Sequence, residues 1–357
     1  MKFVHIADIH FDMPFNLLST RADLGEIRRV EQRKVFKKVI EYIKENKIPY
    51  LFITGDLYEQ QYIKQSTIEY IDELFREIPN TKIYITPGNH DPYIIDSYYN
   101  KYNWSKNVYI FKSKIEKIET EDLNIYGYGF EDFYCYNSQI ENIKIEDKEK
   151  INILLTHASL DGGYDEQRQY NTLSSSKLKQ IGFDYIALGH IHKLNLSKEN
   201  KNIIYPGSTV SLGFDELGQH GMIVGDINKE KINVEFIKLD DKEFCEEKLD
   251  ISEINNIEEL LEKINELKLD ENNLYKLIFI GKRNFEIDIY KLYKLISIRN
   301  IIKIKNNTKL GYNLEKISEE KTLKGIFVKE MLEKMQKEEI NPEIIEKAIE
   351  IGLEVLS

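Results

Sequence analysis

Residues 86–93 read TPGNHDPY and follow the apolar run KIYI. A turn after a strand uses Pro87 and Gly88, and it tolerates an asparagine or an aspartate. Histidine has no such role in a turn, and the chain contains only seven histidines. The position of His90 therefore points to chemistry rather than to turn geometry.

Other apolar runs end in similar polar residues. Together with His90, these runs place five of the seven histidines just past an apolar run. In open α/β sheets, ligands bind beyond the carboxyl ends of the strands. We therefore expect the five segments to meet at one edge. The four further segments are Asp8-Ile-His10, Gly55-Asp56, Thr156-His157 and Gly189-His190-Ile-His192.

The donor atoms in these segments are carboxylate and amide oxygens together with imidazole nitrogens. This mixture suits Mn²⁺, Fe²⁺ or Zn²⁺ better than Ca²⁺ or Mg²⁺. The set is too large for one ion, and it contains no thiolate for a structural zinc. Two ions roughly 3.5–4 Å apart, bridged by one carboxylate, would use all of it and would generate hydroxide for a phosphoryl displacement.

The order of the apolar runs predicts a mixed α/β fold. Runs such as FVHIAD, YLFITGD and KIYITPGN alternate with helices expected at 26–46 and 65–77, which is typical of βαβ units in a largely parallel sheet. Later strands, up to about residue 240, indicate a second sheet packed on the first. Residues 241–305 then read as a small α/β unit, and 306–357 as amphipathic helices, with Phe327, Met331 and Met335 four residues apart.

Composition and charge limit the classes of protein to which this chain can belong and its expected location. The net charge of −11 argues against a chain that simply coats nucleic acid, so a polyanionic substrate would need local positive charge such as metal ions. Cys135 and Cys245 form no pair motif, so a disulfide framework is not expected. No apolar run reaches the roughly 18–20 residues of a membrane span, and the N-terminus shows no signal-peptide pattern. We expect a cytoplasmic protein with no membrane association.

The motifs D-x-H, G-D, G-N-H-D, a lone H and G-H-x-H resemble the calcineurin-like metallophosphoesterase superfamily over residues 3–225. The resemblance implies a two-sheet sandwich flanked by helices, and two divalent metal ions, with Asp56 as the bridge. Together with the change of sequence character near residue 241, it places residues 1–240 in a metallophosphoesterase domain. The implied ligands are Asp8, His10, Asp56 and His192 for one metal, and Asp56, Asn89, His157 and His190 for the other.

The resemblance leaves His90 outside the ligand set. It implies that His90 reaches the scissile phosphate and protonates or stabilises the leaving oxygen, a role worth roughly 10²–10⁴-fold. Asp91 is expected to orient His90 or to hold its charged form, with a turn residue before Pro92 as the alternative. His5 is expected to be a hydrogen-bonded core residue, and His220 a surface residue.

Further stretches resemble SbcD/YhaO-like DNA repair exonucleases: HIADIHFDMPF at 5–15, YPGSTVSLGFDELGQHG at 205–221, and the tail segments TLKGIFVKEML and AIEIGLEVL. GDLYEQ lacks the arginine that protein phosphatases of the superfamily carry. The resemblance implies a Mn²⁺-dependent DNA exonuclease or endonuclease, a homodimer within a heterotetramer with an SbcC-like coiled-coil ATPase.

The parts outside the catalytic domain leave alternatives open. Residues 241–305 would form a cap that contacts DNA, and 306–357 would bind the ATPase. The basic run at 282–309, with eight lysines or arginines, also fits a solvated face, and the helices also fit packing within their own domain. Aromatic residues after the G-N-H-D motif (Tyr93, Tyr98, Tyr99, Tyr102 and Trp104) fit base stacking, although packing is the favoured interpretation. The competing function is hydrolysis of small phosphodiesters such as cyclic nucleotides. The candidate DNA contacts are Lys282, Arg283, Arg299 and Lys303.

Overall fold

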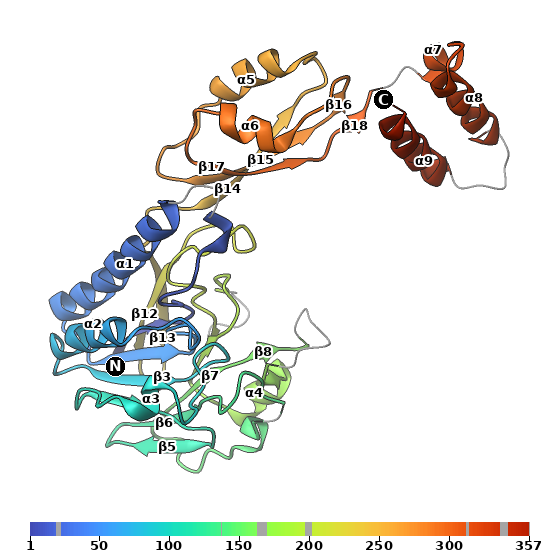
Figure 1. Cartoon of the computed structure of the whole chain (residues 1–357). Helices are drawn as coiled ribbons and strands as arrows, with labels where there is room; N and C mark the ends of the chain where they lie inside the picture. Colours follow the sequence, from blue (N-terminus) through green and yellow to red (C-terminus); the bar gives the residue numbers. More distant parts are fainter. Residues whose placement is uncertain are drawn as a thin grey trace. The chain divides into compact units, whose positions relative to one another are not determined.

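The computed structural model describes residues 1–18, 23–136, 138–162, 170–196, 202–311, 314–335 and 342–356. The chain forms two compact units (Figure 1). The first contains residues 1–245 with 271–274, and the second contains 246–270 with 275–357. The finer division at residue 305 stays a prediction.

A six-stranded sheet forms one half of the first unit, in the order β13-β12-β1-β2-β3-β4. The neighbours from β1 to β4 run parallel, whereas β12 and β13 are antiparallel additions. The short central strands are almost wholly buried, as their unbroken apolar sequences predict. The strands are β1 (Lys2–Ile6), β2 (Tyr50–Thr54), β3 (Lys82–Thr86), β4 (Val108–Ile110), β12 (Gly221–Ile227) and β13 (Ile232–Lys238).

Helices α1 (Leu24–Asn46) and α2 (Gln65–Arg76) connect the first three strands. Because right-handed crossovers place successive helices on the same side of a parallel sheet, both cover one face of it (Figure 1). Their apolar stripes meet at Phe36 and Phe75, whose ring centroids lie 6.0 Å apart. The helices expected at 26–46 and 65–77 are thus confirmed to within two residues at either end.

A second sheet has the order β11-β10-β7-β6-β5 and is parallel except for β5. A continuous apolar core separates the two sheets, with Phe3 and Phe52 from one packed against Tyr185 and Leu155 from the other. Helix α4 (Ser175–Ile181) covers the opposite face through Leu178. The strands are β5 (Glu116–Glu119), β6 (Leu123–Tyr128), β7 (Ile151–His157), β10 (Tyr185–Gly189) and β11 (Ile203–Ile204). The expected two-sheet sandwich is confirmed.

The second unit contains a three-stranded sheet with the order β14-β15-β17. Two short helices bury Leu260, Ile264 and Leu292, and begin at the capping residues Asn256 and Asp288. The elements are β14 (Phe244–Asp250), α5 (Ile257–Asn265), β15 (Leu274–Ile280), β16 (Lys282–Arg283), α6 (Ile289–Leu295), β17 (Ile301–Asn306) and β18 (Lys309–Leu310). The small α/β unit expected here is therefore present.

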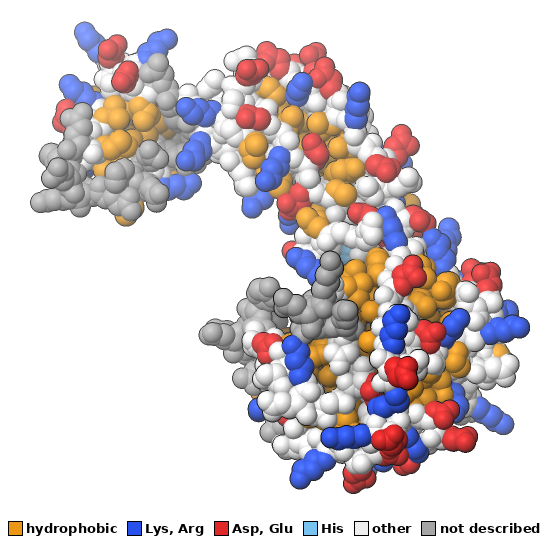
Figure 2. All heavy atoms as spheres, turned by 180° about the vertical axis from the view of Figure 1, so that it is seen from behind, with side chains coloured by type: hydrophobic (Ala, Val, Ile, Leu, Met, Phe, Trp, Pro, Cys, Tyr) orange, Lys and Arg blue, Asp and Glu red, His pale blue; other side chains and the backbone are white. Residues whose placement is uncertain are grey.

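The last helices, α7 (Leu314–Ser318), α8 (Leu323–Met335) and α9 (Pro342–Val355), share an apolar cluster. Phe327, Met331 and Met335 pack in this cluster against the buried residues of α9. The stripe considered for partner binding is therefore at least partly used within the hairpin. Figure 2 shows hydrophobic side chains gathered on the visible face of this segment. The exposed apolar residues here include Leu323, Ile326, Ile344, Ile351 and Val355.

Small elements complete the described chain. They lie in the first unit and join or extend the main strands. No helix in the described ranges combines the length and the apolar character that crossing a membrane requires. The small elements are η1 (Asn16–Leu18), α3 (Tyr98–Lys101), η2 (Ile140–Asn142), β8 (Ser159–Leu160) and β9 (Thr172–Leu173).

Candidate metal centre

The polar residues singled out in the sequence lie at the carboxyl ends of five strands. Strands β1, β2 and β3 lie side by side in one sheet, and β7 and β10 are neighbours in the other. Because the strands within each group are parallel, their following residues gather at one edge. The residues are Asp8 and His10 after β1, Asp56 after β2, Asn89 and His90 after β3, His157 in β7, and His190 and His192 after β10.

Four of the predicted ligands have a left-handed backbone. The φ angles are 51° at Asp8, 54° at His10, 52° at Asp56 and 99° at His190. Such angles are uncommon for residues other than glycine and cost of order 1–3 kcal/mol each. Residues held in this way gather where geometry is set by function, and here they turn the side chains toward one another.

The motif glycines are required by close approach. A Cβ atom at Gly189 would lie 1.7 Å from the carbonyl oxygen of Thr54, and one at Gly88 would lie 2.3 Å from Oδ1 of Asp56. At Gly55, where φ is +88°, a Cβ would lie 2.2 Å from Nδ1 of His157. The glycines therefore let the strand ends of both sheets approach within contact distance.

The rings of His10 and His192 meet edge to face, with their Nε2 atoms 3.3 Å apart. Nδ1 of His10 lies 2.8 Å from Glu59, and Nδ1 of His192 lies 2.6 Å from Glu216. A carboxylate pairs with a protonated Nδ1, so each ring can offer only its Nε2 to a metal ion. Burial disfavours the charged ring of His192, but Glu216 and the Asp8 charge raise its pKa to about 9, so a metal ion on Nε2 would replace a proton there. A cation bound by both Nε2 atoms would remove the repulsion between their lone pairs. Asp8, whose Oδ1 lies 3.9 Å from Nε2 of His192, completes a possible ligand set.

A second group gathers around His157. Its Nδ1 lies 2.9 Å from the carbonyl oxygen of Thr54 and donates to it, while Nε2 lies 3.0 Å from Oδ1 of Asn89 and 3.3 Å from Oδ2 of Asp56. A proton or a metal ion on Nε2 satisfies these two oxygens. The same Asp56 oxygen lies 3.7 Å from Nε2 of His10, so this carboxylate lies between the two groups.

Burial and mutual charge shift the titration of these side chains. Burial raises the pKa of Asp8, although His192 and His157 oppose this shift. Burial also opposes the charge of Asp56, but His157 and the other histidines beside it hold its pKa well below the usual range. Burial and the charge of His157 lower the pKa of His190 to about 3, so this imidazole is neutral and can offer a ring nitrogen to a metal ion.

The donor set fits two divalent cations. Buried carboxylates together with imidazoles whose Nδ1 atoms are fixed by hydrogen bonds, as in His10, His157 and His192, are the arrangement seen around transition metals in proteins. The structure brings all seven predicted ligands to this edge, and His190 adds backbone hydrogen bonds of 3.1 Å to both oxygens of Asp8. Their roles as ligands stay predictions.

His90 lies at the open side of the centre, with 44% of its side chain exposed. Its backbone N–H donates to Oδ1 of Asp56 at 2.8 Å, and its Nδ1 lies 3.0 Å from Glu59. Burial disfavours the charged ring, but Glu59 and the Asp56 charge raise the pKa of His90 to about 9. Glu59 therefore favours the protonated form of this imidazole, and a role of His90 as proton donor stays a prediction.

Asp91 is placed differently from the expectation. Its oxygens accept backbone N–H groups of Asp56 at 3.0 Å, Leu57 at 2.7 Å and Gly88 at 2.6 Å, and the hydroxyl of Tyr99 at 2.6 Å. These bonds brace the two loops that carry the metal centre. Asp91 therefore does not orient the His90 ring by direct contact, because its oxygens are committed to the loops. Burial opposes the charged ring of His90, but the Asp91 charge contributes, after Glu59 and Asp56, to raising the pKa of His90, as the expectation that it holds the charged form requires.

Two acidic residues had no assigned role in the sequence interpretation. Glu59, in the stretch GDLYEQ, contacts both His10 and His90. Glu216 lies within the stretch 205–221 and is buried, and no local pattern marks it as a partner of His192. Long-range folding alone reveals both contacts.

The remaining histidines are structural. His5 is fully buried between the hydroxyls of Tyr185 and Thr54, each 2.9 Å away, so the expectation of a core residue is confirmed. His220 is 3% exposed and bonds to Ser208 at 2.8 Å, so its placement on the surface was wrong. It supports the same network that holds Glu216.

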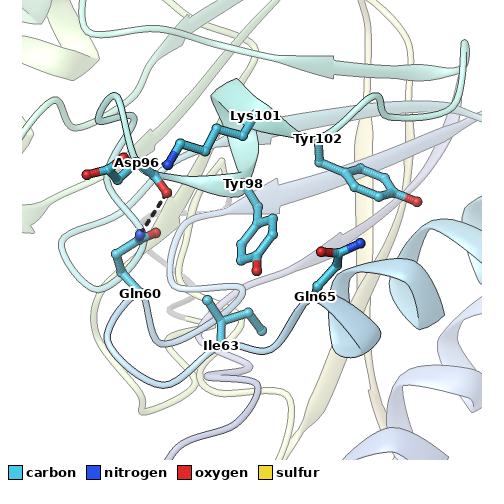
Figure 3. Close-up of a pocket in the computed structure, with 7 residues that line it drawn as sticks. All are labelled: Gln60, Ile63, Gln65, Asp96, Tyr98, Lys101 and Tyr102. Carbon is cyan, nitrogen blue, oxygen red and sulfur yellow. Dashed lines mark hydrogen bonds and ion pairs between the residues drawn. The ribbon is translucent and has the colours of Figure 1, made fainter.

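The aromatic residues after G-N-H-D mainly pack, as favoured. Tyr98 and Tyr102 line a cavity of about 490 Å³ together with Gln60 (Figure 3). Lys101 in its wall is paired with Asp96, whose carbonyl oxygen accepts a hydrogen bond from Gln60 at 3.3 Å. This cavity contains none of the predicted metal ligands.

The candidate DNA contacts belong to the second unit. Lys282 and Arg283 form β16, Arg299 follows α6, and Lys303 lies on β17. Lys282, Arg299 and Lys303 are exposed, and Arg283 is half-buried. Their role in DNA binding stays a prediction.

Paired carboxylates and imidazoles at the strand ends of a two-sheet sandwich define a metal-dependent hydrolase site. Residues 1–194 match the calcineurin-like phosphoesterase family, and the chain belongs to this family. The protein is therefore a phosphoester hydrolase of the dimetal class.

The chain is also similar to YhaO of Bacillus subtilis (strain 168), described as an uncharacterized metallophosphoesterase. The two are 24% identical over 279 residues, which is 74% of this chain and 67% of the relative. A crystal structure of TT1561 from Thermus thermophilus matches 66% of this chain and 98% of its own, at 11% identity and a TM-score of 0.37.

Proposed function

We propose that the protein is the nuclease subunit of an SbcCD-like DNA repair complex, cleaving phosphodiester bonds with Mn²⁺. The observation that supports this most is the second unit, whose exposed lysines and exposed apolar helix surface have no evident use in an enzyme for small diesters. The similarity to YhaO spans 279 residues, so it extends beyond the 194 residues that match the family.

The two ions would supply a hydroxide nucleophile and neutralise charge on the phosphoryl oxygens. Asp56, between the two ligand groups, would hold both. His90 would donate its proton to the leaving oxygen, because Glu59 keeps the ring protonated and the ring faces the open side. Glu59 thus acts as the residue that orients the proton donor.

The wider assembly is part of the same proposal. Lys282, Arg283, Arg299 and Lys303 would contact the DNA backbone, where each phosphate contact adds to a salt-dependent affinity. The helices after residue 306 would bind an SbcC-like coiled-coil ATPase, within a heterotetramer containing two copies of this chain. Because Phe327 and its neighbours pack inside the hairpin, the partner would contact the exposed Leu323 and Ile326 instead. A cytoplasmic location belongs to this proposal.

The catalytic part is tested by incubating the purified protein with Mn²⁺ and a labelled linear duplex, a single-stranded oligonucleotide or bis-p-nitrophenyl phosphate. Metal-dependent shortening of DNA that is lost in His90→Ala supports the nuclease. Turnover of the small diester alone, with the ATPase also present, would favour the small-phosphodiester function instead.

The partner-binding part is tested by Leu323→Glu and Ile326→Glu, which place a charge on exposed apolar positions. Both should weaken binding to an SbcC-like ATPase while cleavage of the small diester persists. Ile95→Glu is the matched control, because Ile95 is 81% exposed in the first unit. Equal binding by all three variants and the unchanged protein would contradict the partner assignment.

A further inference from the structure

A cavity of about 400 Å³ opens directly beside the metal centre. Asn89 and His90 form part of its lining, together with the Glu59 carboxylate that holds His90. Aromatic rings form much of the rest, contributed by segments far apart in the sequence. Those rings are Tyr62, Phe133, Tyr134 and Tyr170.

Two of these rings continue a row of ring-to-ring contacts that begins at the metal centre. The ring of His190 lies 4.8 Å from that of Tyr170, and Tyr170 stacks on Tyr134 with centroids 6.0 Å apart and an interplanar angle of 24°. Tyr134 is 46% exposed, and Tyr62 is 50% exposed. An aromatic surface therefore leads outward from a predicted ligand.

The backbone fixes this surface to the metal centre. Cys135 and Tyr170 form a β-bridge, and the N–H of Asn171 donates to the carbonyl oxygen of Cys135 at 2.7 Å. The Asn171 side chain then donates to the carbonyl oxygen of His157 at 3.0 Å. Tyr134 and Tyr170 are thus held by a short chain of bonds to a predicted ligand, which suits a preformed binding surface.

The chemistry of the lining selects its ligand. None of the described residues that line the cavity is a lysine or an arginine, so these residues offer a phosphate no cationic partner apart from His90. Flat aromatic rings bind nucleobases by stacking, and this contact tolerates any base because every base has a π-face. A phosphate at the metal centre would place the attached nucleoside within reach of Tyr134.

We propose that Tyr134, supported by Tyr170, stacks on an unpaired nucleobase next to the scissile phosphodiester. This inference rests on the proposed nuclease function and narrows its substrate class to single-stranded or frayed ends. A base inside a duplex is already stacked and paired, so it reaches this surface only after unpairing. The surface would bind the base, and the metal centre would bind the phosphate.

The test compares substrates that differ only in the presence of a base. The first pair is a single-stranded oligonucleotide and the same oligonucleotide built from abasic nucleotides, each with Mn²⁺. The second pair is thymidine 5′-(p-nitrophenyl phosphate) and methyl p-nitrophenyl phosphate, which share a leaving group. The measured quantity is the ratio of kcat/KM for the substrate with a base to that without.

Removing the stacking ring should lower this ratio in Tyr134→Ala by about 5- to 150-fold, the range of one base–aromatic stack. Tyr134→Phe should restore the ratio, because it keeps the ring. Tyr136→Ala is the matched control, because Tyr136 is 71% exposed, lies two residues away and does not line the cavity. It should keep the ratio of the unchanged protein.

The outcomes separate the two claims. An unchanged ratio in Tyr134→Ala, or a ratio near one in the unchanged protein, overturns the stacking surface even if DNA is cleaved. A base-dependent ratio seen only with the small diesters, with no DNA cleavage, supports the stacking surface and contradicts the nuclease function. Circular dichroism of each variant verifies that the fold is retained.

Discussion

Replacing Glu216 with glutamine should weaken metal binding although Glu216 is not a predicted ligand. One carboxylate oxygen, Oε2, lies 2.6 Å from Nδ1 of His192 and accepts the hydroxyl of Ser208 at 3.0 Å. The other oxygen accepts the backbone N–H of Leu212. A glutamine that keeps the Leu212 bond must turn its NH₂ group toward His192.

In that orientation the NH₂ group of the glutamine and the Nδ1–H of His192 are both hydrogen-bond donors, so they cannot bond to each other. The ring of His192 can avoid the conflict by moving its proton from Nδ1 to Nε2, but a protonated Nε2 cannot ligate a metal. Loss of such a carboxylate partner typically costs 10- to 100-fold in metal affinity, or about 1.4–2.7 kcal/mol. We expect this loss at one of the two ions.

Calorimetric titration of the metal-free protein with Mn²⁺ measures the affinity directly. Glu235→Gln is the control, because it removes the same charge at an exposed position on β13 of the first unit. Thermal unfolding in EDTA reports any general loss of stability. Mn²⁺ affinity equal to that of the control, at both sites, would refute the reasoning.

Three further predictions concern stability. Burial, opposed by a backbone hydrogen bond, lowers the pKa of His5 from 6.5 to about 3, so the unfolded state binds the extra proton first. The free energy of unfolding should therefore fall as the pH drops below about 6.5, with a slope of up to about 1.4 kcal/mol per pH unit. His5→Gln should remove this slope, as measured by urea unfolding at several pH values. If both proteins show the same slope, the burial argument fails. Gly189→Ala should destabilise by about 1–3 kcal/mol or more, since its Cβ would overlap Thr54, and an unchanged Tm would count against the close approach. Arg28→Ala should cost about 3–5 kcal/mol, since it leaves the buried Asp240 carboxylate unpaired, whereas a loss below about 1 kcal/mol would show that the pair is not desolvated.

The sandwich and the gathering of polar residues follow from local sequence. Unbroken apolar runs alternating with amphipathic helices specify parallel strands, and parallel strands bring their carboxyl ends to one edge. For this reason the sequence alone predicts that Asp8, Asp56 and His157 lie together. The motif glycines carry the same information, because close approach excludes a side chain there.

Contacts that depend on tertiary packing were not predictable. Glu216 lies 24 residues from His192, with only turn-like sequence around it, and Tyr170 and Tyr134 meet only because their loops form a β-bridge. Asp91 shows a related limit, because its neighbour in sequence is His90 while its bonds reach the loop after β2. Side-chain direction in a loop does not follow from sequence spacing.

Amphipathic helices reveal that one face is buried but not what covers it. The spacing of Phe327, Met331 and Met335 predicted an apolar stripe, and the stripe exists. Its cover, at least in part, is helix α9 of the same chain, because the two helices form a hairpin. Periodicity cannot distinguish this arrangement from a face that binds another protein.

We propose a dimetal phosphodiesterase in which His90 would supply the proton and Asp56 would hold both metal ions. The most direct test counts Mn²⁺ ions per chain and measures DNA cleavage in the same preparations of the unchanged protein, His90→Ala and Asp56→Asn. We predict two ions and cleavage in the first, two ions with cleavage reduced by about 10²-fold or more in the second, and loss of metal with loss of cleavage in the third. Full DNA cleavage by His90→Ala, or two tightly bound ions in Asp56→Asn, would contradict this account.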